Sequence, residues 1–249
     1  MASSETLRDP RRVVAGALLV LLSSCSSDAP RSSGESQGGT VAAQQRRSPV
    51  ADSIRARREA ALQRRPDTLG MRADSGRVLG SLSAKVWVVV MSDFQCHSCR
   101  DFARNALAPF RREFVDKGLA RLAFVNAPQD RHFNARFAAT AALCAATVGR
   151  FWEMHDSLFA QQAVWERMPD PRQYFESLAG AAGVPAGVQS DCVARNRMLL
   201  RLSSDLEQSR NASITDVPAV FVADRRLDAD KLTYDGLAAA VKKAIAEGR

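Results

Sequence analysis

Two cysteines separated by two residues, Cys96 and Cys99, carry the clearest chemical signal in this sequence. They follow an apolar, β-rich run at residues 86–90 and precede apolar residues that recur every three to four positions. This pattern predicts a buried strand, a short turn and then a helix that begins at the cysteines. The free N–H groups and positive dipole end of a helix N-terminus stabilise a thiolate on the first cysteine. The stretch therefore predicts thiol–disulfide exchange, with Cys99 close enough to close a disulfide with Cys96.

The same spacing also occurs in metal and haem sites. A structural zinc site needs a second ligand pair, whereas this sequence has no second Cys-x-x-Cys and only isolated His132 and His155. Haem attachment needs a histidine directly after the second cysteine, and Arg100 stands there. Cu(I) binding by the two thiolates and His97, in a non-catalytic binding module, stays an alternative because soft ligands suit that ion. We expect no metal and no cofactor beyond the redox-active cysteine pair.

The composition is that of a basic globular protein. The chain has 249 residues, 46% of them hydrophobic, and a formal charge of +8 from 35 basic and 27 acidic residues. This length favours one compact domain with appendages. A nucleic-acid surface would show a basic stripe interleaved with aromatic residues, and none is present, so we predict a solvated arginine-rich surface and no nucleic-acid partner. Five cysteines suit an oxidising compartment if an export signal is present.

The N-terminus has the pattern of an export signal. Several arginines precede a ten-residue apolar core at residues 13–22, which is too short to span a bilayer as a stable helix. The following Leu-Ser-Ser-Cys25 resembles the lipobox of bacterial lipoproteins. This resemblance implies a signal peptide over residues 1–24 and a lipidated Cys25 as the mature N-terminus, on the periplasmic side of the cell envelope. Ser26 favours the outer membrane, and an ordinary secretory signal is the alternative.

A tether is predicted between the anchor and the folded domain. Residues 25–67 are rich in Ser, Gly, Gln and Ala at first and in arginine from residue 51 onwards. The first composition favours a flexible coil. The arginine-rich part is interpreted as a short solvated helix, with attraction to anionic head groups as the alternative. The folded domain is expected over residues 68–249.

Strand and helix patterns alternate in that domain. Such alternation predicts an α/β sheet, and the helical block predicts an insertion at about residues 130–211. After the active-site helix the expected elements are a strand at 119–126, helices at 132–148, 151–161, 172–180 and 186–210, a strand at 219–223 and a helix at 234–247.

Four stretches in matching order resemble the DsbA-like thioredoxin-fold thiol–disulfide oxidoreductases. They are Ser-Asp-Phe-Gln-Cys-x-x-Cys at 92–99, Gly-x-x-x-Ala at 80–84, Phe-Trp-x-x-His-Asp-x-Leu-Phe at 151–159 and Thr-Asp-Val-Pro-Ala-Val-Phe-Val at 215–222. The resemblance implies a thioredoxin-like fold with a helical insertion and a cis Pro218 that faces the cysteines. A proline there offers no metal-binding side chain, and the backbone of Val217 could pair with an extended substrate. It also implies exported polypeptide thiols as substrates and a membrane redox partner.

The sequence departs from that family at the redox site. His97 and Ser98 stand between the cysteines, where the strongest oxidants of the family carry Pro-His. Val90 replaces the buried carboxylate of thioredoxins, so Asp93 is the nearest acid, and its role in proton transfer is open. We expect His97 to stabilise the thiolate and the potential to lie between roughly −120 and −230 mV. A reductase or isomerase fed by a membrane partner is the alternative.

Two further cysteines, Cys144 and Cys192, lie in the predicted insertion. The resemblance to relatives and an oxidising compartment favour a structural disulfide between them, and two buried free thiols are the alternative. His155 lies with Trp152 and Phe159 on one face of an expected helix, so we assign it to the core of the insertion and not to catalysis.

Overall fold

The computed structural model describes Ser53 and residues 67–248. The chain divides into two units, residues 1–56 and 57–249, and all described residues except Ser53 belong to the second. The predicted signal peptide, the lipidation site Cys25 and the tether up to residue 66, apart from Ser53, lie outside the described residues. No helix among the described residues is long and apolar enough to cross a membrane.

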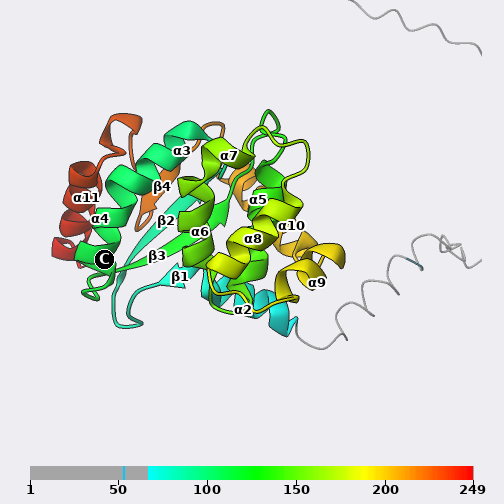
Figure 1. The fold of residues 1–249 in the computed structure, drawn as a ribbon. Helices are drawn as coiled ribbons and strands as arrows, with labels where there is room; N and C mark the ends of the chain where they lie inside the picture. The colour runs from blue at the N-terminus through cyan, green and yellow to red at the C-terminus, as the bar shows by residue number, and fades with distance from the viewer. Residues whose placement is uncertain (1–52, 54–66, 249) are drawn as a thin grey trace, which may run out of the picture. The chain divides into compact units, whose positions relative to one another are not determined.

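A five-stranded sheet forms the centre of the second unit (Figure 1). Its spatial order is β1-β3-β2-β4-β5, with β2 and β3 parallel and the other neighbours antiparallel. Val88 and Val90 of β2 are buried, as the apolar run predicts, because helices cover the sheet. The strands are β1 Val78–Leu79, β2 Val86–Ser92, β3 Ala120–Asn126, β4 Ala219–Val222 and β5 Arg225–Arg226.

One long helical segment connects β2 to β3. It consists of α3 His97–Phe102, the π-helical turn η1 Ala103–Leu107, α4 Ala108–Phe110 and a second π-helical turn η2 Arg111–Val115. The junction residues keep right-handed helical backbone angles, so the helix continues through both π-turns. After β5 and the 3₁₀ turn η3 Ala229–Lys231, the C-terminal helix α11 Tyr234–Ala246 contacts α4, β4 and β2.

The helical insertion lies between β3 and β4. Its helices are α5 Ala135–Ala146, α6 Phe151–Ala160, α7 Gln162–Trp165, α8 Arg172–Ala181, α9 Val188–Ala194 and α10 Leu199–Asn211. A central sheet with this insertion confirms the predicted α/β architecture. The prediction of one helix over residues 186–210 is wrong. The helix stops after Ala194 because Asn196 adopts a positive φ of 49° and the N–H of Arg197 turns back to the carbonyl of Cys192.

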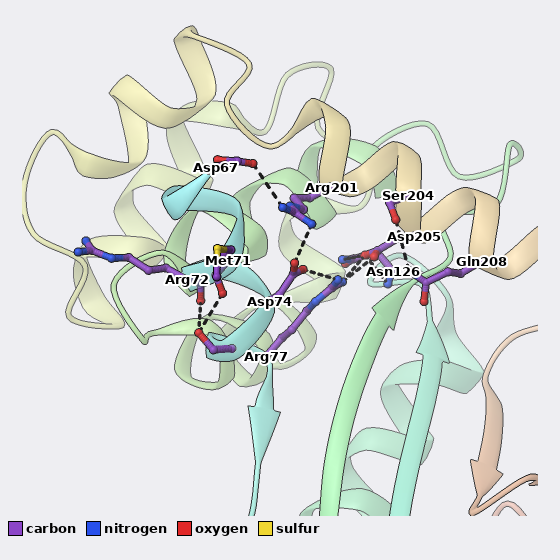
Figure 2. A network of polar contacts seen from close by, with 11 residues as sticks. Asp67, Met71, Arg72, Asp74, Arg77, Asn126, Arg201, Ser204, Asp205 and Gln208 are labelled. Atoms are coloured by element: carbon purple, nitrogen blue, oxygen red, sulfur yellow. Dashed lines mark hydrogen bonds and ion pairs between the residues drawn. The ribbon is translucent and has the colours of Figure 1, made fainter. Parts of the chain in front are cut away.

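A buried polar network fastens the start of the domain to its interior (Figure 2). The helix α2 Thr68–Gly76 leads into Arg77, whose guanidinium donates to both oxygens of Asp205 at 2.6 Å. Asp205, on α10, is fully buried and also accepts from the backbone N–H and the side-chain amide of Asn126 at 3.1 and 2.7 Å. The network therefore joins α2, α10 and the last residue of β3, and it fixes the loop that follows β3.

Candidate active site

The cysteine pair lies where β2 ends and α3 begins. β2 ends at Ser92, and a turn closes when the N–H of Cys96 donates to the carbonyl of Asp93 at 3.1 Å. Cys96 has extended backbone angles and is the N-cap of α3. Its carbonyl accepts the first hydrogen bond of this helix, from the N–H of Arg100 at 3.1 Å. Cys99 is in the first turn of this helix, as the pattern of residues 86–99 predicts. The sulfurs of Cys96 and Cys99 are not bonded to each other.

Hydrogen bonds stabilise the thiolate of Cys96. The largest effect is a hydrogen bond from the thiol of Cys99, and the hydroxyl of Ser98, 3.0 Å from the Cys96 sulfur, adds a second. Burial of Cys96 and the negative charge of Asp93 act in the opposite direction. The net result lowers the pKa of Cys96 to about 6. A large share of Cys96 is therefore thiolate at neutral pH, which is the form that attacks disulfides.

Cys99 is in the opposite state. It is fully buried, and burial together with the negative charge on Cys96 raises the pKa of its thiol far above the usual range. The buried Ser92 side chain, at the end of β2, forms a hydrogen bond with Cys99 that opposes this shift. Cys99 thus keeps its proton while Cys96 is ionised, and it donates that proton toward the Cys96 thiolate.

The loop before β4 faces the cysteines. The peptide bond between Val217 and Pro218 is cis. The carbonyl of Val217 accepts from the hydroxyl of Ser98 at 3.3 Å and from the thiol of Cys96 at 3.6 Å. The Ser98 proton therefore has two acceptors, the Cys96 sulfur and this carbonyl. The backbone N–H of Val217 has no hydrogen-bond partner within the described part of the chain.

A cavity of about 810 Å³ opens beside this loop. Ser98, Val217 and Pro218 line its end nearest the cysteines. Its apolar lining comes from Phe102 and Ala106 of the active-site helix, from Leu227 and Leu232 between β5 and α11, and from Tyr234, the first residue of α11. Charged and polar residues line it as well, namely Asp101, Asn105, Asp216, Arg226, Asp228 and Thr233. A polypeptide segment that enters the cavity at that end would lie against the loop that faces the nucleophile.

Asp93 is occupied by contacts with the backbone and with the loop after β3. Its buried carboxylate accepts from the N–H groups of Gln95 and Gln129 at 2.7 and 2.8 Å and contacts Nδ1 of His132 at 2.7 Å. These contacts hold the turn that carries Cys96 against the loop after β3. The charge of Asp93 raises the pKa of Cys96, and its backbone forms a hydrogen bond with Cys99 that acts to lower the pKa of that thiol, so this residue modulates both cysteines.

The helical insertion supplies contacts that the sequence does not reveal. The fully buried Gln162 donates to the carbonyls of Phe94 and Cys96 at 2.7 and 3.0 Å. His97 points to the insertion as well, because its Nε2 lies 2.6 Å from Oε2 of Glu166. These partners lie 66 and 69 residues from the cysteine turn, and no local spacing identifies them.

His155 lies in an aromatic cluster beside the turn and not at the sulfurs. Its ring contacts Phe94, Phe124 and Phe159 edge-on at centroid distances of 5.7, 5.2 and 5.0 Å. Burial lowers the pKa of this histidine, which favours the neutral ring. Its position agrees with the packing role that the residue pattern indicates. No group of three or more potential metal ligands occurs among residues 67–248.

The second cysteine pair is bonded. Cys144 on α5 and Cys192 on α9 form a disulfide with a Cα–Cα distance of 5.9 Å. Both residues are buried, at 0% and 3% exposure, within the insertion. The sulfurs that bridge the insertion are therefore separate from those at the cysteine turn.

The sequence profile of the thioredoxin family matches residues 72–243 of this chain. The chain belongs to the thioredoxin family. The match starts within α2 and ends within α11, so it includes all five strands of the sheet and the whole insertion.

The curated relatives of this thioredoxin-family chain include a protein named for disulfide bond formation and a longer antiporter. Disulfide bond formation protein D of Bacillus subtilis is 26% identical over 182 residues, a match that covers 68% of this chain and 76% of that protein. The Na⁺/H⁺ antiporter NhaA 3 of Salinispora tropica is 33% identical over 177 residues. That match covers 71% of this chain but 26% of the antiporter, so the similarity concerns about a quarter of the longer protein.

Solved structures show the same fold. Oxidised BdbD from Bacillus subtilis matches with a TM-score of 0.61 and 24% identity, over 68% of this chain and 92% of that chain. DsbA from Chlamydia trachomatis matches with a TM-score of 0.58 and 18% identity, over 69% and 91% of the two chains. The chain has the DsbA-like thioredoxin fold.

Proposed function

We propose that Cys96 and Cys99 are the redox couple that transfers disulfides to thiols of exported polypeptides. The opposite pKa shifts of the two cysteines carry this proposal, because one sulfur is stabilised as a thiolate and its neighbour is held as a thiol. Cys96 is then the sulfur that exchanges with substrate, and Cys99 is the resolving thiol.

The reaction begins with the Cys96–Cys99 disulfide. A substrate thiolate attacks the Cys96 sulfur, the Cys96–Cys99 bond breaks, and Cys99 leaves with the electron pair and takes up a proton. A second substrate thiolate attacks the substrate sulfur of this mixed disulfide and releases Cys96 as a thiolate. The substrate gains a disulfide and loses two electrons, which the cysteine pair holds. Hydrogen bonds from Cys99 and Ser98 stabilise the released thiolate and so favour this last step.

The substrate is proposed to bind along the loop before β4 and in the cavity beside it. The free N–H of Val217 offers a backbone donor to an extended chain, as in strand addition. Its carbonyl accepts from the hydroxyl of Ser98 at 3.3 Å, so an incoming chain would share this acceptor with Ser98. Apolar side chains of the substrate would enter the 810 Å³ cavity next to Pro218.

The reduced pair needs an oxidant, and a membrane-bound disulfide donor is the proposed partner. Lipidation of Cys25 would keep the domain at the membrane where such a partner resides, on the periplasmic side of the cell envelope. The signal-peptide and lipobox patterns of residues 1–25 support this location.

Trapping of mixed disulfides tests the proposal. In Cys99→Ala the resolving thiol is absent, so substrates should accumulate on Cys96 as adducts that non-reducing gels resolve and reductant releases. Cys96→Ala is the matched control and should capture none. Adducts on Cys99 in that control would reverse the assigned roles.

Mass spectrometry tests the anchor separately. Protein made in a bacterium that processes lipoproteins should carry a diacylglyceryl group on Cys25, and Cys25→Ser should abolish the added mass and the membrane association. A soluble mature chain that begins elsewhere would refute the anchor and leave the redox proposal intact.

A further inference from the structure

Glu166 contacts the only residue between the cysteines that carries an ionisable side chain. His97 directly follows Cys96 and is the first residue of α3. Its side chain is 62% exposed, yet Nε2 lies 2.6 Å from Oε2 of Glu166, whose side chain is only 14% exposed. An exposed imidazole without a partner would sample several rotamers. The carboxylate restricts it to the side of the helical insertion.

The backbone around Glu166 is fixed by buried groups. Its carbonyl accepts from Nε2 of Gln95 at 2.8 Å, and Gln95 is the residue directly before Cys96. Oε1 of Gln95 in turn accepts from the N–H of Asn134 at 2.8 Å. The preceding Trp165 is fully buried, and its indole N–H donates to the carbonyl of Leu158 at 2.8 Å. Glu166 therefore contacts the turn that presents Cys96, although it lies 69 residues after His97 in the chain.

The charges around this pair are few and can be named. Arg167 approaches Oε1 of Glu166 at 3.8 Å but is 90% exposed, so solvent screens it. Arg100, one turn along α3, pairs with Asp101 at 2.9 Å. Asp93 acts on Cys96 through its charge. Glu166 is thus the anion that directly contacts the imidazole next to the nucleophile.

We propose that Glu166 is a positioning residue of the redox site, which holds the imidazole of His97 and, when that imidazole is protonated, offsets the positive charge beside the Cys96 thiolate. The proposal rests on the proposed role of Cys96 as the exchanging sulfur. A nearby anion disfavours a thiolate, and a nearby cation favours it. Glu166 therefore makes the couple less oxidising than His97 alone would make it, since stabilisation of the reduced thiolate raises the potential.

Opposite substitutions at the pair test this assignment. Glu166→Gln keeps an oxygen that can accept from His97 and removes the carboxylate charge, whereas His97→Ala removes the imidazole that the carboxylate contacts. Glu153→Gln is the matched control, because Glu153 on α6 also pairs with an arginine, Arg150 at 2.8 Å, away from the cysteine turn. Two quantities are measured for each full-length protein: the thiolate pKa of Cys96, from absorbance at 240 nm, and the equilibrium constant with glutathione.

Glu166→Gln should lower the Cys96 pKa by about half a unit, which stabilises the thiolate about threefold and shifts the glutathione equilibrium toward the reduced protein. His97→Ala should shift both quantities in the opposite direction, and Glu153→Gln should shift neither. If Glu166 had only a structural role, Glu166→Gln would change the melting temperature, and the two substitutions would not shift the Cys96 pKa in opposite directions.

An unchanged or raised Cys96 pKa in a folded Glu166→Gln protein would overturn the inference. If that variant does not fold, His97→Ala decides, because an unchanged or lowered pKa there would also overturn it. Failure of the proposed function looks different: the wild-type protein itself would then form no disulfide with glutathione at Cys96.

Discussion

The two cysteine pairs of this chain are both buried and differ in every other respect. Cys144 and Cys192 are 48 residues apart in sequence, lie on two helices of the insertion and form a disulfide. Cys96 and Cys99 lie in one turn of one helix, and hydrogen bonds from Cys99 and Ser98 stabilise the Cys96 thiolate. Burial alone therefore does not separate a structural cysteine from a redox cysteine.

The difference lies in what surrounds the sulfurs. Small alanine side chains, Ala141, Ala142 and Ala145, share the buried part of α5 with Cys144. Cys96 instead has a hydroxyl, a thiol and the carbonyl of Val217 within reach. A thiolate can form only where such donors offset the cost of burial. The polar surroundings of Cys96 thus predict reactivity, and the apolar surroundings of Cys144 predict an inert bridge.

Activity should give the largest contrast between the two pairs. Cys96→Ala should abolish thiol–disulfide exchange, because the sulfur that forms the mixed disulfide is lost. The double variant Cys144→Ala with Cys192→Ala should keep the exchange rate of the wild type at temperatures where it is folded. Insulin reduction in the presence of dithiothreitol measures both. Comparable losses in the two variants would show that the bridge takes part in the redox reaction.

The free energy of unfolding should depend more on the Cys144–Cys192 pair than on the Cys96–Cys99 pair. The Cys144–Cys192 bridge closes a loop of 48 residues. Loss of the bridge should lower the free energy of unfolding by about 4 kcal/mol, because the unfolded chain regains its loop entropy. Urea unfolding of the double alanine variant, compared with Cys99→Ala as a variant of the other pair, measures the effect. A decrease below about 1 kcal/mol would mean that helix packing alone holds the insertion together.

Local patterns in the sequence predict the cysteine turn and much of the fold. The apolar run at 86–90 and the helical spacing after Cys99 depend on neighbours a few residues apart, so they identify β2 and the helix that follows. The helix break at Asn196 is not visible in this way. It depends on a positive φ at a residue type that tolerates such angles, in a stretch whose apolar spacing continues to be helical.

The polar partners of the site cannot be predicted from local patterns. Gln162 and Glu166 contact the cysteine turn across 66 and 69 residues, and both lie in the insertion, whose docking on the sheet fixes the contact. The buried Arg77–Asp205 pair, 128 residues apart, is a similar case. Long-range hydrogen bonds depend on tertiary packing, and a single sequence gives no spacing that identifies them.

The two cysteine pairs should also differ in how their alkylation depends on pH. Because the pKa of Cys96 is about 6, its alkylation rate by iodoacetamide should rise through pH 6 and level off near pH 8. The reduced protein should also gain stability relative to the oxidised form as pH rises from about 6 toward 8.5, the usual thiol range, and lose this gain as pH falls through 6. Peptide mapping should find Cys144 and Cys192 unmodified throughout. A rate that rises only above pH 8 would refute the stabilised thiolate.

The smallest expected effect concerns Ser98, which supplies the second hydrogen bond to the thiolate. Ser98→Ala should raise the Cys96 pKa from about 6 by on the order of half a unit, because the sulfur loses one donor and keeps the stronger one from Cys99. Ser98→Thr retains a hydroxyl and should stay close to the wild type. Ser98→Ala also removes the hydrogen bond that the Ser98 hydroxyl donates to the carbonyl of Val217. Absorbance titration of the thiolate measures the shift, and equal shifts in the alanine and threonine variants would show that the hydroxyl is not the group responsible.

Cys99→Ala should raise the pKa of Cys96 further than Ser98→Ala does, since it removes the larger of the two hydrogen-bond effects. That order would establish that the reactivity of the first pair comes chiefly from the partner cysteine, which the bonded pair in the insertion cannot provide.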